Sequence, residues 1–487
     1  MFAAAVSLAG AARPSFWYDE AATISASYSR SLSDLWQLVG EVDAVHALYY
    51  LLMHGWFAVV PPTEFWSRVP SGLAVGGAAA GLVVLGKQLS SRTVGVTAGV
   101  VCAILPRATW AGIEARPYAL SMMLAVWVTV ALVYATRRAA WWAWAGYGAL
   151  LAVSILLEVY LALLVFVHIV YIVHVASFRR RRAVVVPFAV TSAVVVGATA
   201  PFVALVAGQV QQIAWITPIG GRTVEDVAVQ QYFDRNPYFA AMAALVMLTA
   251  VVVWVCTSRR ADREAVVLSA AWLVIPTASI VGWSAVADPL YTPRYLSFTA
   301  PAMALLLAVC IAALSRSAWV AAAVVVLFGV VAAPTYVAVQ RGPYAKYGMD
   351  YSQVADLISA NAAAGDCLLV NDTVTFHPAP MRPLLAARPD AFGALADVSL
   401  WQRAVERRNV FDTNLIPQAS VGPLQQCGTV WILTQADPAA PEHEQGVAIP
   451  PGPLFGGTPA FAVSHDMGFR LTERRQFNLV QVIRAQR

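Results

Sequence analysis

The chain has 487 residues, of which 59% are hydrophobic and only 12% charged, and its mean hydropathy is +0.64. Soluble domains carry about 25% charged residues, so this composition excludes an ordinary soluble protein and indicates a polytopic α-helical membrane protein. The net charge of +5 does not indicate nucleic-acid binding, because much of it lies in short clusters between apolar runs.

The first twelve residues, MFAAAVSLAGAA, are apolar but would span only about 18 Å as a helix, against roughly 30 Å of hydrocarbon. A signal peptide is the alternative, although the segment lacks a basic start. We expect a first membrane span here, and we expect its true beginning to lie upstream of Met1.

A first outer loop is predicted over residues 13–65, and it begins with the stretch WYDEA. This stretch places Asp19 and Glu20 side by side. A carboxylate held there can deprotonate a hydroxyl group, whereas a solvated loop acid or a helix N-cap is the plainer interpretation. Later in the loop, LYYLLMHGWFAVV (48–60) is expected to lie as a helix at the outer membrane interface.

Ten further spans are predicted, which gives eleven in all. The basic clusters between spans, at Arg137-Arg138, Arg179 to Arg182 and Arg259-Arg260, then all fall on the cytoplasmic side, and the tail of the chain falls outside. The predicted spans are 66–86, 92–106, 117–136, 141–157, 159–177, 183–206, 237–257, 264–286, 294–314 and 317–338.

Two arginine motifs follow at predicted outer ends of spans. The stretch EARPYAL contains Arg116, whose guanidinium group matches phosphate oxygens, although an anchor for lipid headgroups is an equal alternative. The stretch ADPLYTPRYLSF contains Asp288, Arg294 and Tyr295, and an interfacial Arg-Tyr belt is its alternative. Together these motifs suit an anionic ligand whose tail stays in the bilayer.

Other polar residues are weaker candidates. Glu158, in the outer turn LLEVYLALL, is either an acid that supports the site or an ordinary turn carboxylate. His46 and His54 have no neighbours at metal-ligand spacing and are better explained as interfacial residues. The sequence also contains no nucleotide-binding glycine loop and no serine-hydrolase motif.

Together these features resemble the GT-C superfamily of membrane glycosyltransferases, especially its protein O-mannosyltransferase-like and bacterial lipid-modifying branches. The resemblance covers about residues 1–340. Where the family pattern has two prolines after its histidine, this chain continues His46-Ala47-Leu48-Tyr49, which weakens the assignment of His46. The stretches that carry the resemblance are WYDEA, DAVHALYYLLMHGWF, FWSRVPSGL, EARPYAL and DPLYTPRYL.

The resemblance implies a GT-C transmembrane domain that uses a polyprenyl-phosphate sugar donor on the extracytoplasmic side, with inversion. It assigns Asp19 as the general base and Arg294 as the ligand of the donor phosphate, with Arg116 as a second candidate. Metal dependence stays open, because Asp19, Glu20 and Asp43 offer carboxylates to a divalent cation, Mg²⁺ or Ca²⁺, whereas some members of the family that the chain resembles need no metal. The predicted sites are catalytic Asp19 and Glu20; donor-phosphate-binding Arg294, Arg116 and Tyr295; and substrate-binding Tyr49, Tyr50, His46, Glu114, Tyr118, Glu158 and Asp288.

The tail, 341–487, has ordinary charge density and is predicted to be a separate extracytoplasmic α/β domain with parallel strands. YSQVADLISANAAAGDCLLV predicts a helix, a glycine turn and a buried strand, CGTVWILTQ predicts another strand, and FNLVQVIR predicts a closing edge strand. Cys367 and Cys427 either stay reduced or form a disulfide, which requires a tail outside the cytoplasm.

We therefore predict a plasma-membrane glycosyltransferase that moves mannose from a polyprenyl-phosphate donor to a glycan, lipid or protein acceptor of the cell envelope. An arabinofuranosyltransferase would use the same residue types. A lipid or solute transporter is the alternative of a different class, but it predicts charges in mid-span and an internal repeat, and the sequence has neither.

Overall fold

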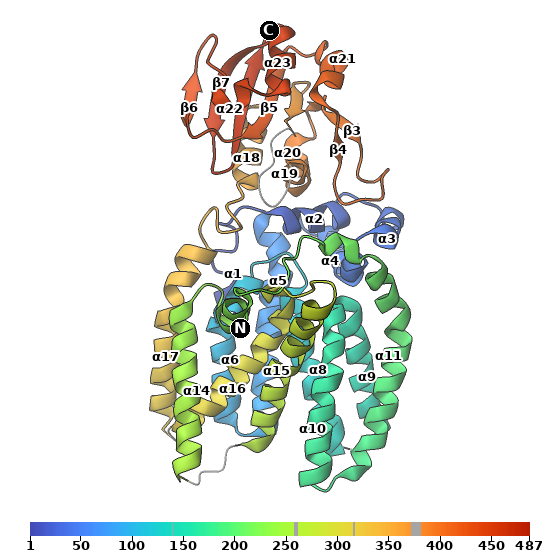
Figure 1. Cartoon of the computed structure of the whole chain (residues 1–487), viewed down its shortest axis with the longest axis vertical. Helices are drawn as coiled ribbons and strands as arrows, with labels where there is room; N and C mark the ends of the chain where they lie inside the picture. Colours follow the sequence, from blue (N-terminus) through green and yellow to red (C-terminus); the bar gives the residue numbers. More distant parts are fainter. Residues whose placement is uncertain (139, 258–261, 315–316, 372–380) are drawn as a thin grey trace. The chain divides into compact units, whose positions relative to one another are not determined.

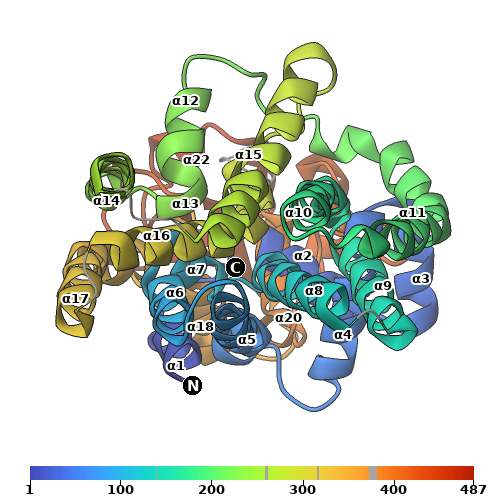
Figure 2. The same cartoon turned by 90° about the horizontal axis from the view of Figure 1, so that it is seen from below.

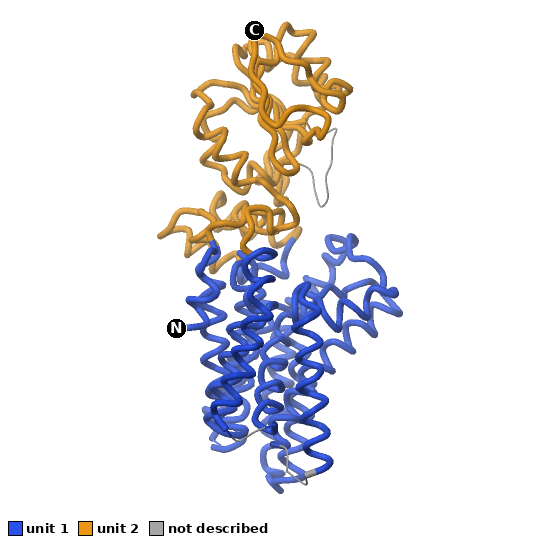
Figure 3. Tube along the Cα trace, turned by 90° about the vertical axis from the view of Figure 1, so that its left-hand side faces the viewer, with its two compact units in different colours: residues 1–11, 43–49, 68–340 blue, residues 12–42, 50–67, 341–487 orange. Residues whose placement is uncertain are grey.

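The structure is a computed structural model of the whole chain (Figure 1). The chain divides into two compact units, which Figure 3 colours separately. Unit 1 comprises residues 1–11, 43–49 and 68–340, and unit 2 comprises residues 12–42, 50–67 and 341–487. The described residues are 1–138, 140–257, 262–314, 317–371 and 381–487.

Unit 1 is helical. Eight helical segments among the described residues are long and apolar enough to cross a membrane, so the chain is a multi-pass membrane protein. The eight are α5 (Glu64–Leu89), α8 (Tyr118–Arg138), η2 (Val159–Leu163) with α10 (Leu164–Phe178), η3 (Arg182–Val184) with α11 (Val185–Gly208), α14 (Pro237–Thr257), α15 (Arg263–Val286), η6 (Pro293–Thr299) with α16 (Ala300–Leu314), and α17 (Ala318–Pro334) with η7 (Thr335–Gln340).

Two shorter apolar helices, α6 (Arg92–Ile104) and α9 (Trp141–Leu157), occupy the two remaining predicted spans. Where a first span was expected, the structure has only α1 (Phe2–Leu8), whose seven residues are too short to cross a bilayer. The predicted total of eleven spans is therefore not confirmed. The predicted basic cluster Arg259-Arg260 lies outside the described residues.

The predicted span 92–106 is interrupted. Leu105 is extended, with φ −65° and ψ 123°, which is typical of a residue before proline, and α7 (Pro106–Ala111) begins at Pro106. The chain thus turns after α6, and α7 carries Arg107 into the site described below. The remaining short elements of unit 1 are η1 (Ala44–His46), η4 (Val210–Ile213), α12 (Thr223–Glu225), η5 (Asp226–Gln230) and α13 (Gln231–Phe233).

The long helices pack through small residues. A Cβ atom on Gly86 or Gly95 would collide with the backbone of the facing helix, so α5 and α6 approach each other more closely than larger residues permit. Seen from below (Figure 2), α16 runs beside α6, α14 and α15, and it is almost entirely buried. This centre supports η6, the element that carries Arg294.

Unit 2 begins with three helices, α2 (Tyr18–Ser27), α3 (Leu32–Glu41) and α4 (Ala47–Phe57), although the unit boundary falls within α4 and within α5. Ser31 and Asp34 form a reciprocal capping box at the start of α3. The helix expected over 48–60 corresponds to α4, and its position at the membrane interface stays a prediction.

The C-terminal part of unit 2 contains a six-stranded sheet in the order β2-β1-β5-β8-β7-β6. β1 pairs in parallel with β2 and β5, whereas the other pairs are antiparallel. The strands are β1 (Cys367–Val370), β2 (Ala396–Asp397), β5 (Thr429–Gln435), β6 (His443–Gln445), β7 (Arg470–Gln476) and β8 (Val480–Gln486), with β3 (Leu400–Gln402) and β4 (Thr413–Asn414) forming a separate pair.

The helix, glycine turn and strand predicted from YSQVADLISANAAAGDCLLV are present as α18 (Tyr351–Asn361), Gly365 with φ +90°, and β1. CGTVWILTQ forms β5. The prediction that FNLVQVIR closes the sheet at an edge is wrong, because β8 lies between β5 and β7 and is paired on both sides. The edges are instead the short strands β2 and β6, which expose few unpaired backbone groups.

Short helices share an apolar core with the strands of this sheet, and Cys367 of β1 is joined to Cys427 by a disulfide. Of the two outcomes left open by the sequence, the structure therefore has the oxidised one. The helices not yet named are α19 (Arg382–Ala387), α20 (Pro389–Phe392), η8 (Pro417–Ser420), α21 (Val421–Leu424), α22 (Pro453–Gly456) and α23 (Pro459–Asp466).

Candidate active site

Unit 1 brings four of the predicted residues into one cationic cluster, which we define as His46, Arg116, Glu158 and Arg294. The guanidinium group of Arg116 donates a short hydrogen bond from Nη2 to Nε2 of His46, and both residues are buried. Arg116 also interacts electrostatically with Glu158, and Arg294 with His46. Residues from four separate elements thus surround one charged region.

The backbone around Arg116 is set by local sequence. Pro117 keeps Arg116 out of the helical conformation and starts the turn into α8, whose first regular hydrogen bond runs from Ser121 N to Pro117 O at 2.8 Å. Ser71 of α5 donates from Oγ to the carbonyl oxygen of Glu114 at 2.5 Å, and the same Oγ lies 3.5 Å from the carbonyl oxygen of Arg116. The EARPYAL stretch is therefore fastened to the neighbouring helix.

His46 is a neutral hydrogen-bond acceptor. Burial lowers its pKa well below the ordinary value, and the positive charges of Arg116 and Arg294 lower it further. Because a guanidinium group can only donate, Nε2 must accept from Arg116, and the ring proton then lies on Nδ1. His46 thus orients Arg116 without adding a charge.

Glu158 lies in the turn between α9 and η2 and is 3% exposed. Burial raises its pKa to about 8, against the opposing effects of Arg116 and of a backbone hydrogen bond at Tyr160. At neutral pH the carboxyl group is therefore mostly protonated. It adds a hydrogen-bond donor to the cluster rather than a negative charge.

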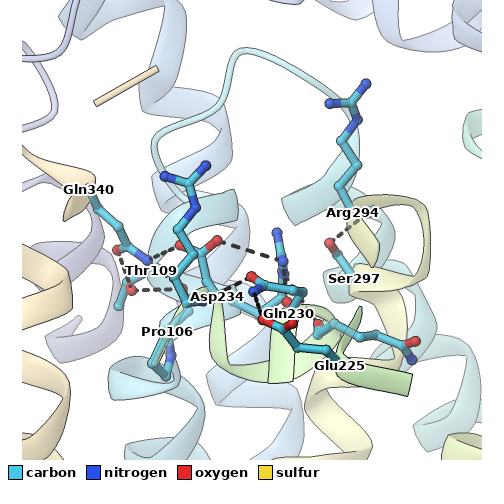
Figure 4. Close-up of polar contacts among 11 residues, drawn as sticks. Pro106, Thr109, Glu225, Gln230, Asp234, Arg294, Ser297 and Gln340 are labelled. Carbon is cyan, nitrogen blue, oxygen red and sulfur yellow. Dashed lines mark hydrogen bonds and ion pairs between the residues drawn. The ribbon is translucent and has the colours of Figure 1, made fainter. Parts of the chain in front are cut away.

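Arg294 is the second residue of η6, and its carbonyl oxygen accepts a 2.6 Å hydrogen bond from Ser297 Oγ (Figure 4). Its guanidinium carbon lies 4.8 Å from the ring centroid of Trp215 and 5.7 Å from that of Tyr295. Aromatic rings at these distances attract the cation and restrict the orientation of its plane.

Aromatic side chains line up next to this arginine. The ring of Tyr295 lies 6.4 Å from Tyr118, in a stacked arrangement, and 5.8 Å from Tyr160. Tyr118 in turn contacts Trp110 of α7 at 5.4 Å between centroids. Trp110, Tyr160 and Trp215 were not predicted, because a lone aromatic at the end of an apolar run is indistinguishable from a core or interfacial residue.

A buried polar network connects α7 and α13, which both pack against η6, the element that carries Arg294 (Figure 4). Arg107 of α7 donates to the carbonyl oxygens of Gln230 and Gln231 and lies 3.7 Å from the carboxylate of Asp234. Gln340 donates to Asp234 Oδ2 at 2.7 Å and to Pro106 O at 2.8 Å. The network joins α7, α13 and η7, and buried groups so satisfied favour one arrangement of these elements.

Gln231 continues this network toward η6. Its Nε2 lies within hydrogen-bond distance of Tyr232 Oη, of Thr277 Oγ1 of α15 and of Thr299 Oγ1 of η6, and its Oε1 accepts from Tyr291 Oη at 3.2 Å. Arg107 and Gln231 were not predicted from the sequence. The available signal was an arginine directly after a proline at the end of an apolar run.

The predicted acid pair belongs to unit 2. Trp17 is the N-cap residue of α2, so Asp19 and Glu20 lie in the first helical turn, where the positive end of the helix dipole favours negative charge. Glu20 is fully buried, whereas Asp19 is partly exposed. We call this segment, Tyr18–Ser27, the acidic helix.

The acidic helix is fastened to the C-terminal part of the chain. The dipeptide Ser15-Phe16 binds Ser352 through two hydrogen bonds: Ser352 Oγ accepts from Phe16 N and Ser15 Oγ accepts from Ser352 N, both at 3.0 Å. The rings of Trp17 and Tyr347 lie 4.5 Å apart. Further along α2, Ser25 donates from Oγ to Val410 O at 2.5 Å.

The fold has counterparts among solved structures. ArnT from Cupriavidus metallidurans in the apo state has a TM-score of 0.58 at 12% identity, over 98% of this chain and 95% of that one. The structure of ArnT bound to undecaprenyl phosphate has a TM-score of 0.56 at 13% identity, over 99% and 96%. The chain has the GT-C fold.

The mycobacterial arabinofuranosyltransferase AftD is also similar, with a TM-score of 0.50 at 15% identity, over 92% of this chain but only 37% of AftD. No protein-family model matches the sequence, and no curated protein matches it. The GT-C fold expected from WYDEA, EARPYAL and DPLYTPRYL is thus confirmed by structure, at identities too low for sequence comparison.

Within this GT-C fold the other predicted residues are dispersed. Tyr49 and Tyr50 are both buried in α4, the first in unit 1 and the second in unit 2. Glu114, two positions before Arg116 in the chain, is buried, whereas Asp288 is exposed in the loop between α15 and η6. The roles predicted for these four residues are not tested by their positions.

The carboxylates expected to hold a divalent cation are divided between the units, Asp19 and Glu20 in unit 2 and Asp43 in unit 1. Throughout the part of the chain that the structure describes, no three histidine, cysteine, aspartate or glutamate side chains are grouped closely enough to hold a metal ion. The cation therefore stays a prediction.

Proposed function

We propose that this protein is a membrane glycosyltransferase that transfers a sugar, mannose, from a polyprenyl-phosphate donor to an extracytoplasmic acceptor. The acceptor is a glycan, lipid or protein of the cell envelope, and transfer proceeds with inversion. The observation that carries the proposal is the cationic cluster, in which Arg116 and Arg294 are gathered around a neutral histidine in a chain with the GT-C fold.

The electrostatics of the cluster suit a phosphate group. At neutral pH its four side chains carry two positive charges and, because Glu158 is mostly protonated, little negative charge. Guanidinium groups bind phosphate oxygens through paired hydrogen bonds, each worth about 1.5–3 kcal/mol. Such contacts strengthen as the phosphate gains charge on leaving the sugar, which lowers the barrier to transfer.

In the proposed reaction an acceptor hydroxyl oxygen forms a bond to the anomeric carbon as the bond from that carbon to the phosphate oxygen breaks. Polyprenyl phosphate leaves with the bonding electrons, and attack from the opposite face inverts the anomeric centre. The hydroxyl proton passes to the carboxylate of Asp19, whose partial exposure suits a base that must reach an acceptor. Buried Glu20 would support the position of Asp19.

The remaining predicted residues are assigned to the substrates. The stacked rings of Tyr118 and Tyr295 offer apolar faces to a sugar ring beside the phosphate. Tyr49, Tyr50, Glu114 and Asp288 are proposed as further substrate contacts, and the polyprenyl chain would stay among membrane lipids.

The extracytoplasmic orientation is supported by two observations. Arg116 precedes α8, and Glu158 follows α9. The basic pair Arg137-Arg138 and the basic run Arg179 to Arg182 lie at the opposite ends of α8 and α10. The cluster is therefore remote from the basic turns. Because basic turns favour the cytoplasm, this arrangement supports the proposal that the cluster lies on the other side. The Cys367–Cys427 disulfide is also typical of an oxidising compartment.

Arabinofuranose is the second candidate sugar. It is favoured by the similarity of the fold to AftD, which is an arabinofuranosyltransferase, although AftD is much longer than this chain. The geometry of the cluster concerns the phosphate and is equally compatible with a pentose or a hexose.

The test is transfer of radiolabelled sugar by membranes that contain the full-length protein, with polyprenyl-phosphate mannose and polyprenyl-phosphate arabinose supplied separately. Wild type should label an envelope acceptor from one donor, and Arg294→Ala should lose most of this transfer. Arg222→Ala, an exposed arginine of the same unit, is the matched control and should keep it. Equal labelling by wild type and Arg294→Ala would contradict the phosphate assignment, and no labelling from either donor would contradict the proposed function.

A further inference from the structure

One segment of unit 1, residues 209–215 after α11, contacts Arg294 of the cationic cluster and the turn that leads into His46. Its Trp215 lies over Arg294, with 4.8 Å from the guanidinium carbon to the ring centroid. Its Gln209 and Gln212 bind the turn that carries His46: Gln212 Oε1 accepts from Asp43 N at 3.0 Å and Gln209 Oε1 accepts from Ala44 N at 2.8 Å. Neither half of this arrangement was expected from the sequence.

The contact between Trp215 and Arg294 is a cation–π contact, which restrains the guanidinium group through an aromatic ring rather than through a hydrogen-bond acceptor. A guanidinium group stacks on an aromatic ring through its face, whereas its N–H donors point outward in its plane. The ring of Tyr295 lies 5.7 Å from the same guanidinium carbon. Two rings thus restrict the rotation of Arg294, whose flexible stem would otherwise lose conformational entropy when it bound an anion.

The glutamines act on Arg116 through His46. The first N–H groups of a helical turn have no acceptor within the turn, and Gln209 and Gln212 supply acceptors for Ala44 and for the preceding Asp43. Asp43 has φ 59°, a left-handed conformation that is costly for a residue other than glycine and needs support from its surroundings. This turn fixes His46, which accepts from Arg116.

We propose that segment 209–215 is a clasp that positions both arginines for the donor phosphate, with Trp215 acting on Arg294 and with Gln209 and Gln212 acting on Arg116 through His46. This inference rests on the proposed function, since it concerns the same phosphate. It makes Trp215 a positioning residue, which orients the arginine rather than reacting with the substrate.

The test is binding of undecaprenyl phosphate to the purified full-length protein in nanodiscs. Binding is measured as the rise in the unfolding temperature of the protein when the ligand is added. Trp215→Ala should weaken binding about fivefold, the loss expected for one cation–π contact, whereas Trp215→Phe should restore most of the affinity. Trp283→Ala removes a tryptophan of nearly equal exposure, 54% against 53%, from α15 and should bind as wild type does. Undecaprenol, which lacks the phosphate, should not distinguish the variants.

A double-mutant comparison shows whether Trp215 acts through Arg294. In an Arg294→Ala background, Trp215→Ala should cause no further loss, because the guanidinium group that it orients is gone. Independent, multiplicative losses would overturn the inference. In the same Arg294→Ala background, the double variant Gln209→Leu with Gln212→Leu should still weaken phosphate binding, because these glutamines act on Arg116. Unchanged binding by that variant would overturn the part of the inference that concerns the two glutamines.

The outcomes separate the inference from the function on which it rests. If wild type fails to bind undecaprenyl phosphate and transfers no sugar, the proposed function fails. If wild type binds the phosphate and both Trp215→Ala and the glutamine double variant bind it equally well, the function stands and the clasp does not exist. If Trp215→Ala and Trp215→Phe weaken undecaprenol as much as undecaprenyl phosphate, the loop supports the lipid site generally, and the assignment to phosphate is wrong.

Discussion

The cationic cluster and the acidic helix are built in different ways. The cluster takes one residue each from η1, from the turn before α8, from the turn after α9 and from η6, and it is held by side-chain contacts within unit 1. The acidic helix takes its two carboxylates from adjacent positions in the sequence, and it is held by the backbone and rings of segments 343–352 and 409–411 in unit 2.

The difference follows from the chemistry proposed for each region. Stabilising a leaving phosphate requires several cations in one water-poor place, so residues from several helix ends must converge. Removing a proton from an acceptor requires one accessible carboxylate, which a single short helix can present. We therefore expect changes in the acidic helix to reduce turnover and changes in the cationic cluster to reduce donor affinity.

The largest expected effect is that of Asp19→Asn. It should lower the rate of transfer about a thousandfold, the usual contribution of a general base, while leaving binding of undecaprenyl phosphate unchanged. The measurement is a pair of assays, sugar transfer in membranes and phosphate binding in nanodiscs. Glu41→Gln, which alters an exposed acid of α3, is the control and should retain activity. If Asp19→Asn transfers sugar at nearly the wild-type rate, Asp19 is not the general base.

Next in size is the loss of the disulfide. Replacing Cys367 and Cys427 by serine should lower the free energy of unfolding of unit 2 by about 4 kcal/mol, because the closed loop of 60 residues restricts the unfolded chain. Hydrogen exchange of β1 and β5 measures this effect, and Cys256→Ser is the control for removing a thiol. If the acidic helix and the cationic cluster act separately, the variant without the disulfide should lose turnover with little change in its affinity for the donor. An equal fall in donor affinity would break the comparison.

The third prediction concerns Asp350, which accepts from Leu479 N at 2.6 Å and from Val480 N at 2.9 Å and is fully buried. Burial raises its pKa from 3.8 to about 6. The folded state therefore binds this proton more tightly than the unfolded state, so the contribution of Asp350 to stability falls as the pH rises from about 4 to about 6. The full change is about 3 kcal/mol.

Thermal unfolding of unit 2 between pH 4 and pH 7 measures this dependence. Asp350→Asn should lack it, so the difference between wild type and variant should shrink or reverse as the pH rises. The same pH dependence in both proteins would show that another group is responsible. Because Asp350 adjoins Tyr351 and Ser352, this measurement also reports on the support of the acidic helix.

The smallest expected effect is on the cationic cluster. Glu158, with a pKa of about 8, should ionise between pH 7 and pH 9 and place a negative charge next to Arg116. Donor affinity of wild type should then weaken about fivefold over this range, through repulsion of the phosphate. Binding of undecaprenyl phosphate by Glu158→Gln should stay constant with pH. A wild-type affinity that rises with pH would reverse the sign of the argument.

Sequence patterns were most informative where one property decides the structure. Apolar runs predicted ten helices because hydrocarbon leaves backbone groups no other partners, and YSQVADLISANAAAGDCLLV predicted α18 and β1 because its apolar period changes at a glycine. The edge position assigned to β8 was wrong because apolar strand residues do not encode which neighbours pair with them.

By itself, the sequence determined that this is a multi-pass membrane protein with a GT-C-like pattern, since composition and short motifs carry that information locally. Only the tertiary structure decided that His46, Arg116, Glu158 and Arg294 converge, that Trp215 lies over Arg294, and that the acidic helix is held by residues more than 300 positions away. Each of these depends on burial and on contacts between distant segments, and burial is also what makes the histidine neutral and the carboxyl group protonated.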